Sequence, residues 1–299
     1  MKFKIFSLFP LGLTAIILLL LCLLSGCAEK EMIGSREVLL PPVSAEATGI
    51  YHPGRFVWVD LITPDLQAAQ EFYGKLFGWT FLKHEKYYEV FNGKRRIACL
   101  VAVEPKDGEN ATAQWLPSMS VPDVDEAVDR AAANGGKVIN GPVDMPLRGR
   151  GALLLDLEGA SFVVLHAKDG DPEERQPGIG DWLWVENWSA GLIKAVDFYK
   201  AIGQYDATLA GKDYVILLNE DRWRAGIRKV KQVEFSGQWV PVVRVKDPAA
   251  TAAQVESLGG LVWLNPDDSQ TSSDTVLISD NTGALLILQR WTFPAEGDK

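Results

Sequence analysis

Hydrophobic and polar residues follow two periodicities along the chain. Phe56 to Leu61 alternates as a strand does, and Pro64 to Phe77 carries apolar side chains at helical spacing before Gly78, a residue that commonly ends helices. Tyr87 to Val103 predicts two strands joined by an Asn-Gly turn. Another strand, helix and set of strands is expected over residues 116–121, 123–133, 137–139, 152–155 and 161–165. The first half of the chain therefore predicts two consecutive βαβββ units.

The same pattern returns in the second half of the chain. Trp58 pairs with Trp184, Phe72-Tyr73 with Phe198-Tyr199, Gly135-Gly136 with Gly259-Gly260 and Gly159-Ala160 with Gly283-Ala284, at offsets of 126, 126, 124 and 124 residues. A nearly constant offset sustained over this length is typical of a duplicated domain. The second copy predicts strands over 240–245, 261–264, 275–279 and 285–288 and a helix over 249–258. The predicted fold class is α+β, with tandem domains at 54–167 and 179–292 and a charged, Pro- and Gly-containing linker at 168–178.

The N-terminus has the pattern of a secretory signal. Lys2 and Lys4 precede an apolar run from Leu11 to Leu24, and the run ends in Leu24-Ser25-Gly26-Cys27, which resembles the bacterial lipobox. The resemblance implies that residues 1–26 are removed, that Cys27 carries lipid, and that the protein is anchored to the bacterial cell envelope on the periplasmic side, at the outer membrane of a Gram-negative host. The alternative is an uncleaved membrane anchor. Residues 27–53 lack sustained periodicity and predict a tether.

Composition narrows the possible partners. The chain is 47% hydrophobic and 23% charged, as folded proteins are, and its net charge of -9 gives no general attraction to nucleic acid. Of the three cysteines, Cys22 and Cys27 belong to the signal region. Cys99 lies in an apolar run, so we expect a buried structural residue and no disulfide.

Three stretches of sequence carry a family resemblance. They are DLQAAQEFYGKLFGW at Asp65–Trp79, VPDVDEAV at Val121–Val128, and GRGALLLDLEGASFVVL at Gly149–Leu165. In this order they resemble the vicinal oxygen chelate superfamily, which includes glyoxalase I, extradiol dioxygenases and bleomycin-resistance proteins. The resemblance covers residues 54–291. It implies that the βαβββ units curl into open, cup-shaped mixed sheets that hold the ligand, with acid or imidazole ligands of a divalent metal projecting from defined strands.

The positions that match the metal ligands of the superfamily offer no donor atom in this chain. They are occupied by Trp58, Leu116 and Val163 in the first copy and by Trp184, Val240 and Ile287 in the second. The three histidines, His52, His84 and His166, have the count and spacing of ordinary surface residues. We therefore predict neither a metal nor another cofactor.

Aromatic and acidic residues share the strand that would carry the first metal ligand. Alternation places Phe56, Trp58 and Asp60 on one face in the first copy, and Trp182, Trp184, Glu186 and Trp188 on the matching face in the second. Arg150, with Arg148, is expected at the rim. A carboxylate beside an aromatic face favours a planar or cationic ligand, which predicts metal-free binding or sequestration of a small organic molecule.

Two alternatives to the binding prediction stay open. Trp58 and Trp184 can simply fill the space of a lost metal site. The chain can also be a lyase, isomerase or dioxygenase that uses Asp60, Glu186 or a metal site not visible in the sequence. The sequence does not indicate the oligomeric state.

Overall fold

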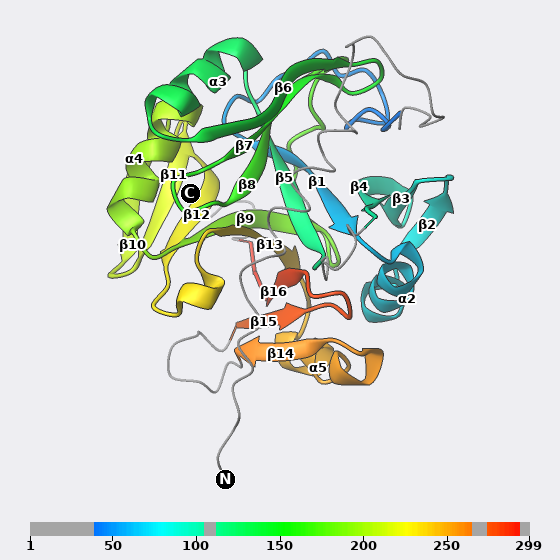
Figure 1. Ribbon diagram of the computed structural model, residues 1–299. Helices are drawn as coiled ribbons and strands as arrows, with labels where there is room; N and C mark the ends of the chain where they lie inside the picture. The colour runs from blue at the N-terminus through cyan, green and yellow to red at the C-terminus, as the bar shows by residue number, and fades with distance from the viewer. Residues whose placement is uncertain (1–38, 105–111, 265–273, 294–299) are drawn as a thin grey trace.

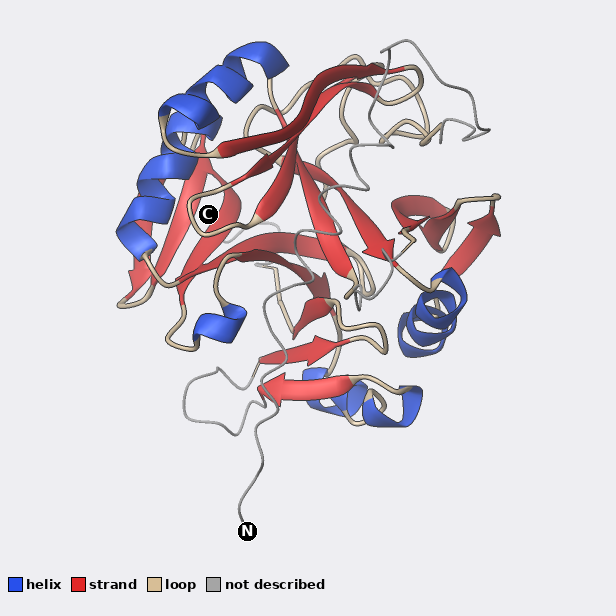
Figure 2. Cartoon of the chain, in the orientation of Figure 1, coloured by secondary structure: helices blue, strands red, loops and turns tan. Residues whose placement is uncertain are grey.

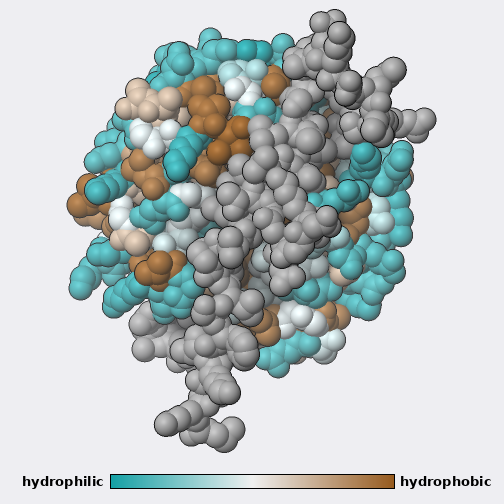
Figure 3. All heavy atoms as spheres, in the orientation of Figure 1, coloured by the Kyte–Doolittle hydropathy of each residue, from teal (hydrophilic) through white to brown (hydrophobic). Residues whose placement is uncertain are grey.

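The computed structural model describes residues 39–104, 112–264 and 274–293 (Figure 1). The expected signal peptide and Cys27 lie outside these ranges and stay predictions. Among the described helices, none is long and apolar enough to cross a membrane. On the face drawn in Figure 3, the described surface is largely hydrophilic, with apolar residues in smaller groups.

The first domain consists of the two predicted βαβββ units in one eight-stranded sheet. The strand order is β2-β3-β4-β1-β5-β8-β7-β6. The first strands of the two units, β1 and β5, pair antiparallel at the centre, and each pairs in parallel with the last strand of its own unit. The elements are β1 (Phe56–Thr63), α2 (Leu66–Phe77), β2 (Thr80–Lys83), β3 (Tyr87–Asn92), β4 (Arg95–Ala102), β5 (Gln114–Ser120), α3 (Val124–Ala133), β6 (Lys137–Met145), β7 (Gly149–Leu155) and β8 (Ser161–Ala167).

The second domain repeats this topology, with strand order β10-β11-β12-β9-β13-β16-β15-β14. Its expected helix over 249–258 is divided into a short α-helix and a 3-10 turn. The elements are β9 (Trp182–Ser189), α4 (Leu192–Gly203), β10 (Asp206–Gly211), β11 (Tyr214–Asn219), β12 (Arg222–Lys229), η1 (Val233–Phe235), β13 (Gln238–Arg244), α5 (Pro248–Ala252), η2 (Glu256–Leu258), β14 (Leu261–Leu264), β15 (Thr275–Ser279) and β16 (Leu285–Gln289).

Local signals explain where the first helices begin and end. The Asp65 carboxylate accepts a hydrogen bond from the backbone N–H of Ala68 (2.9 Å) at the start of α2. Gly78 ends the helix with φ 72°, a left-handed conformation that glycine adopts without a steric penalty. Asp123 caps α3 in the same way as Asp65 caps α2. Both predicted starts are confirmed to within two residues.

Two buried clusters join the domains. The hydroxyl of Tyr73 on α2 donates to Asp280 Oδ2 in the second domain (2.8 Å) and accepts from the indole Nε1 of Trp115 (3.1 Å). The duplicated counterparts make the same contacts in the opposite direction: Tyr199 donates to Asp156 (2.8 Å) and accepts from Trp239 (2.8 Å). Helices α3 and α4 lie side by side across the domain boundary (Figures 1 and 2). One apolar core therefore serves the helix-bearing faces of both sheets.

The described part of the expected tether packs on the first domain. The backbone N–H groups of Thr48 and Gly49 donate to the Asp169 carbonyl (2.9 and 3.0 Å). The buried Asp171 carboxylate accepts from the His52 backbone N–H (2.7 Å) and from Ser120 Oγ (2.6 Å). Residues 39–53 are thus part of the folded domain and not a free tether, and linker residue Asp171 fixes them there.

Candidate functional site

A bulge near the start of β1 and of β9 decides which side chains reach each cup. The register of β1 against β5 shifts between Phe56 and Trp58, and Phe56 turns to contact Trp239, with ring centroids 4.5 Å apart. Trp182 lies beyond the equivalent irregularity and contacts Trp115 (4.9 Å). The expectation that Phe56 and Trp182 face the cups is wrong, because an extra residue in a strand inverts the alternation.

Asp60 lies at the centre of the first cup, which is the face of the first sheet that carries Trp58 and Asp60. The residue is 5% exposed; its Oδ1 accepts from the indole Nε1 of Trp58 (2.8 Å) and its Oδ2 from Arg148 Nη1 (2.5 Å). The Arg148 guanidinium also lies over the Trp58 ring, 5.5 Å from its centroid. Each carboxylate oxygen therefore has a donor, and the charge of Asp60 is balanced by a buried arginine.

Glu186 occupies the same position in the second cup, the face of the second sheet that carries Trp184 and Glu186. Arg228 binds it with two bonds, Nε to Oε2 (2.8 Å) and Nη2 to Oε1 (3.0 Å), and the Tyr214 hydroxyl donates to Oε1 (2.8 Å). Trp188 Nε1 donates to Oε2 (3.1 Å). Trp184 is excluded from this network: its buried Nε1 has no hydrogen-bond partner among the described residues.

Arg150 does not reach either carboxylate. Its guanidinium binds Asp125 (2.7 and 2.9 Å) and Asp144 (3.1 Å) at an exposed position. Arg148, two residues earlier, is the arginine that enters the first cup. Of the predicted site residues, the structure brings Trp58 into contact with Asp60 and Trp188 into contact with Glu186. Arg150 instead forms surface ion pairs with Asp125 and Asp144.

The cysteine and the histidines take structural positions. Cys99 is fully buried, and burial together with the nearby Asp60 raises the pKa of its thiol, which fits the structural role expected for it. The histidines bind through ordinary polar contacts: His52 lies 3.9 Å from Glu174, His84 2.8 Å from Glu89, and His166 3.1 Å from the Val121 carbonyl. The His166 ring stacks on that of Tyr51, with centroids 4.5 Å apart.

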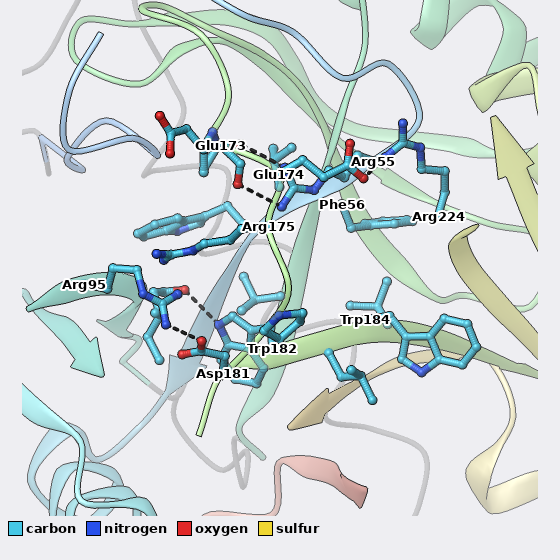
Figure 4. Close-up of a pocket in the computed structure, with 18 of the residues that line it drawn as sticks. Arg55, Phe56, Arg95, Glu173, Glu174, Arg175, Asp181, Trp182, Trp184 and Arg224 are labelled. Atoms are coloured by element: carbon cyan, nitrogen blue, oxygen red, sulfur yellow. Dashed lines mark hydrogen bonds and ion pairs between the residues drawn. The ribbon is translucent and has the colours of Figure 1, made fainter. Parts of the chain in front are cut away.

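A cavity of about 230 Å³ lies where the two domains and their linker meet (Figure 4). It is lined by the starts of β1, β4, β9 and β12 and by residues 172–177 of the linker, and both Trp58 and Trp184 border it. Trp182 is fixed in its wall, because its Nε1 donates to the Ile97 carbonyl (2.8 Å). Trp184 contacts Trp223 beside it, with centroids 6.1 Å apart.

Arginines outnumber acids around this interdomain cavity. Arg95 is paired with Asp181, and Arg224 with Glu174 (2.8 Å). Arg55 donates only to the carbonyls of Pro172 (2.8 Å) and Glu173 (3.5 Å). Arg175 makes no hydrogen bond or ion pair within the described ranges, and burial and the charge of neighbouring Arg95 lower its pKa. The cavity therefore combines aromatic walls with two guanidinium groups, those of Arg55 and Arg175, that form no direct ion pair within the described residues.

Sequence reasoning missed this cavity. Its arginines come from the first strand, a hairpin, the linker and the second domain, so no local pattern joins them. The charged linker was the available signal, but charge alone indicates a solvated boundary. Tyr214 and Arg228, which hold Glu186, were missed for the same reason.

The metal positions implied by the superfamily do not fit a metal here. Trp58, Leu116 and Val163, and their counterparts in the second domain, supply no nitrogen or oxygen ligand of the kind divalent metals bind. The nearest acids are already bound by arginine. Within the described part of the chain there is no cluster of three acidic, histidine or cysteine side chains able to hold an ion.

Comparison with known proteins agrees with this architecture. Residues 55–164 match the model of the Glyoxalase/Bleomycin resistance protein/Dioxygenase superfamily. A Mycobacterium tuberculosis protein named "Putative glyoxylase CFP32" is 28% identical over 246 residues, 79% of this chain and 94% of that protein. Anthracycline biosynthesis protein DnrV of Streptomyces peucetius is 26% identical over 272 residues, 82% of this chain and 97% of that protein.

Solved structures share the fold at low identity. The Mn(II)-bound glyoxalase from Novosphingobium aromaticivorans has a TM-score of 0.57 at 14% identity, over 80% of this chain and 82% of that one. An extradiol ring-cleaving dioxygenase from B. fuscum has a TM-score of 0.58 at 12% identity, over 88% and 77%. Two tandem, duplicated α+β domains of this topology define the class. The first domain thus matches the Glyoxalase/Bleomycin resistance protein/Dioxygenase superfamily model, and the second domain repeats its topology.

Proposed function

We propose that the chain binds a planar organic anion of one or two rings in the interdomain cavity, without a metal. The observation that carries this proposal is that one cavity is lined both by Trp184, whose buried Nε1 has no acceptor among the described residues, and by Arg175, which forms no ion pair there. An unpaired buried donor is costly, and a ligand that accepts from it recovers that cost. An aryl carboxylate that reaches either group gives it an acceptor, and its ring can pack on the tryptophans.

The charge of the site favours an anion over the cationic ligand that the sequence suggested. Asp60 and Glu186 were the expected cation partners, and both are neutralised by arginine. The cavity, at about 230 Å³, is smaller than sites that hold drug-sized ligands. A small aromatic acid is therefore the ligand class best matched to it.

Asp60 and Glu186, the acid or base named for the enzymatic alternative, are both bound by other side chains. A general acid or base needs an oxygen that can reach the substrate proton, whereas the oxygens of Asp60 and Glu186 accept bonds from Trp, Tyr and Arg side chains. Two relatives are named for glyoxylase activity and anthracycline biosynthesis. Those names support a small organic ligand for this chain.

Isothermal titration with 2-naphthoate tests the proposal. Arg175→Ala should weaken binding about tenfold, the effect of losing a partly exposed charge-assisted hydrogen bond. Trp184→Phe, which keeps the ring and removes the indole N–H, should also weaken it. The neutral 2-naphthamide should bind less tightly than the acid.

Arg150→Ala is the matched control, because it removes an arginine from the exposed pair with Asp125 and should leave binding unchanged. Binding that is lost in Arg150→Ala but kept in Arg175→Ala would place the site at the rim of the first cup. No binding of either ligand by the wild-type chain would refute the proposal.

We also propose that Cys27 is acylated and anchors the chain to the periplasmic side of the bacterial envelope, at the outer membrane in a Gram-negative host. The Leu24-Ser25-Gly26-Cys27 run at the end of an apolar segment supports this location. Metabolic labelling with a palmitate analogue should mark the wild-type protein. Labelling that persists in Cys27→Ser would contradict the proposal.

A further inference from the structure

The first cup is filled by the chain itself. Val43 is 3% exposed and belongs to the same apolar cluster as Trp58, Ile62 and Cys99, and Leu40 packs against that cluster. The segment 40–44 therefore lies over the strand positions that match the superfamily's metal ligands. A small molecule cannot enter the first cup while this segment is in place.

The polar groups of the segment match the floor of the cup. Arg148 Nε donates to the Pro41 carbonyl (3.0 Å), and Arg96 Nη2 donates to the carbonyls of Pro42 (2.6 Å) and Ser44 (3.1 Å). Proline has no backbone N–H, so the two prolines present acceptors only. The guanidinium groups of Arg96 and Arg148 in the cup are donors only, so they match these acceptors. These hydrogen bonds use only backbone carbonyls of the segment, so they do not depend on the charge of its side chains.

Both guanidinium groups are positioned by other residues. Asp60 holds Arg148 and is itself oriented by Trp58. Glu89 holds Arg96 (2.7 Å). Both guanidinium groups also lie over the Trp58 ring, at 5.5 and 5.9 Å from its centroid. Trp58 and Asp60 of the first strand thus help to orient the two arginines toward the segment.

We propose that the first cup is a binding site for a proline-containing peptide, and that residues 40–44 are its ligand, bound in cis. The site joins the N-terminal segment to the first domain and withholds that cup from other ligands. This inference does not depend on the aryl anion proposed for the interdomain cavity.

Cys99, under the segment, is a native reporter for the test. In the chain that starts at residue 27 with Cys27→Ser, Cys99 is the one remaining thiol, since the sequence has three cysteines. Its rate of alkylation measures how often the segment leaves the cup. Val43→Asp places a charge in the apolar cluster and should raise that rate about tenfold or more. Ala45→Asp, at the exposed position directly after the segment, should not change it.

A peptide added in trans completes the test. The peptide VLLPPVSAE, residues 38–46, should slow the alkylation of Cys99 in Val43→Asp, and the same peptide carrying Val43→Asp should not. Where circular dichroism shows that Val43→Asp is unfolded, Val43→Ala gives the same comparison with a smaller rate increase. A folded variant that is alkylated at the wild-type rate, or one that the peptide does not protect, would overturn the inference.

Discussion

The tyrosine hydroxyls that cross the domain boundary should carry measurable stability. In Tyr73→Phe the ring keeps its edge contact with Phe72, 5.1 Å between centroids, while the bond to Asp280 is lost and the Trp115 indole has no acceptor. A hydrogen bond to a charged group contributes about 1.5–3 kcal/mol, and an unpaired buried donor costs at least about 1 kcal/mol more. We therefore expect Tyr73→Phe to lower the free energy of unfolding by about 3 kcal/mol.

Urea unfolding measured by tryptophan emission, with linear extrapolation to water, gives this difference. Tyr199→Phe should lose a similar amount, because Asp156 and Trp239 repeat the arrangement. Tyr88→Phe is the control, since the Tyr88 hydroxyl makes no hydrogen bond within the described ranges. A loss below about 1 kcal/mol in both boundary variants, or an equal loss in Tyr88→Phe, would refute the role given to these clusters.

Two further results are expected. Burial raises the pKa of Tyr73, Tyr199, Tyr205 and Tyr214, so above about pH 10 the unfolded chain releases protons that the folded chain keeps, and stability should fall as pH rises. Absorbance at 295 nm should then show four of the seven tyrosines ionising only with unfolding, and their ionisation in the native state would contradict the expected shifts. Trp58→Phe should cost about 1–3 kcal/mol by leaving an oxygen of the buried Asp60 carboxylate without its donor, whereas Trp184→Phe should cost little because its N–H has no described partner; equal losses in urea unfolding would argue against this difference.

The architecture could be predicted from the sequence because the duplication repeats apolar periodicity, caps and glycine turns. Strands β2 and β10 were not predicted, because they lie at sheet edges with mostly exposed side chains and so carry no buried face. The facing of Phe56 and Trp182 was predicted wrongly, since a bulge leaves no mark in the hydrophobic pattern. The packing of residues 40–44 on the first domain was not predicted, because these residues make contact through prolines and backbone carbonyls, which leave no periodic pattern.

The repeated Asp-x-x-Gly-Ala turns could be recognised in the sequence, but their structural role at the domain boundary could not. Gly159-Ala160 lies in one of the runs that carried the family resemblance, and Gly283-Ala284 was visible as its repeat. In the structure, the aspartate of each turn accepts from the Ala backbone N–H within the turn (2.8 and 2.9 Å) and from a tyrosine of the other domain. The long-range half of that role depends on how the domains pack, which no local pattern records.

The two copies have diverged at the same strand position. In the first domain the indole of Trp58 binds Asp60 two residues later, and this pair aims Arg148 at the N-terminal segment. In the second domain Trp188 and Arg228 bind the oxygens of Glu186, and the indole N–H of Trp184, a residue that lines the interdomain cavity, has no acceptor among the residues that the structure describes. The tryptophan at this strand position thus contacts arginines that bind residues 40–44 in one copy, and its counterpart has an indole N–H without a described partner in the other. A function inferred from the family alone, through a metal at this position, would miss both.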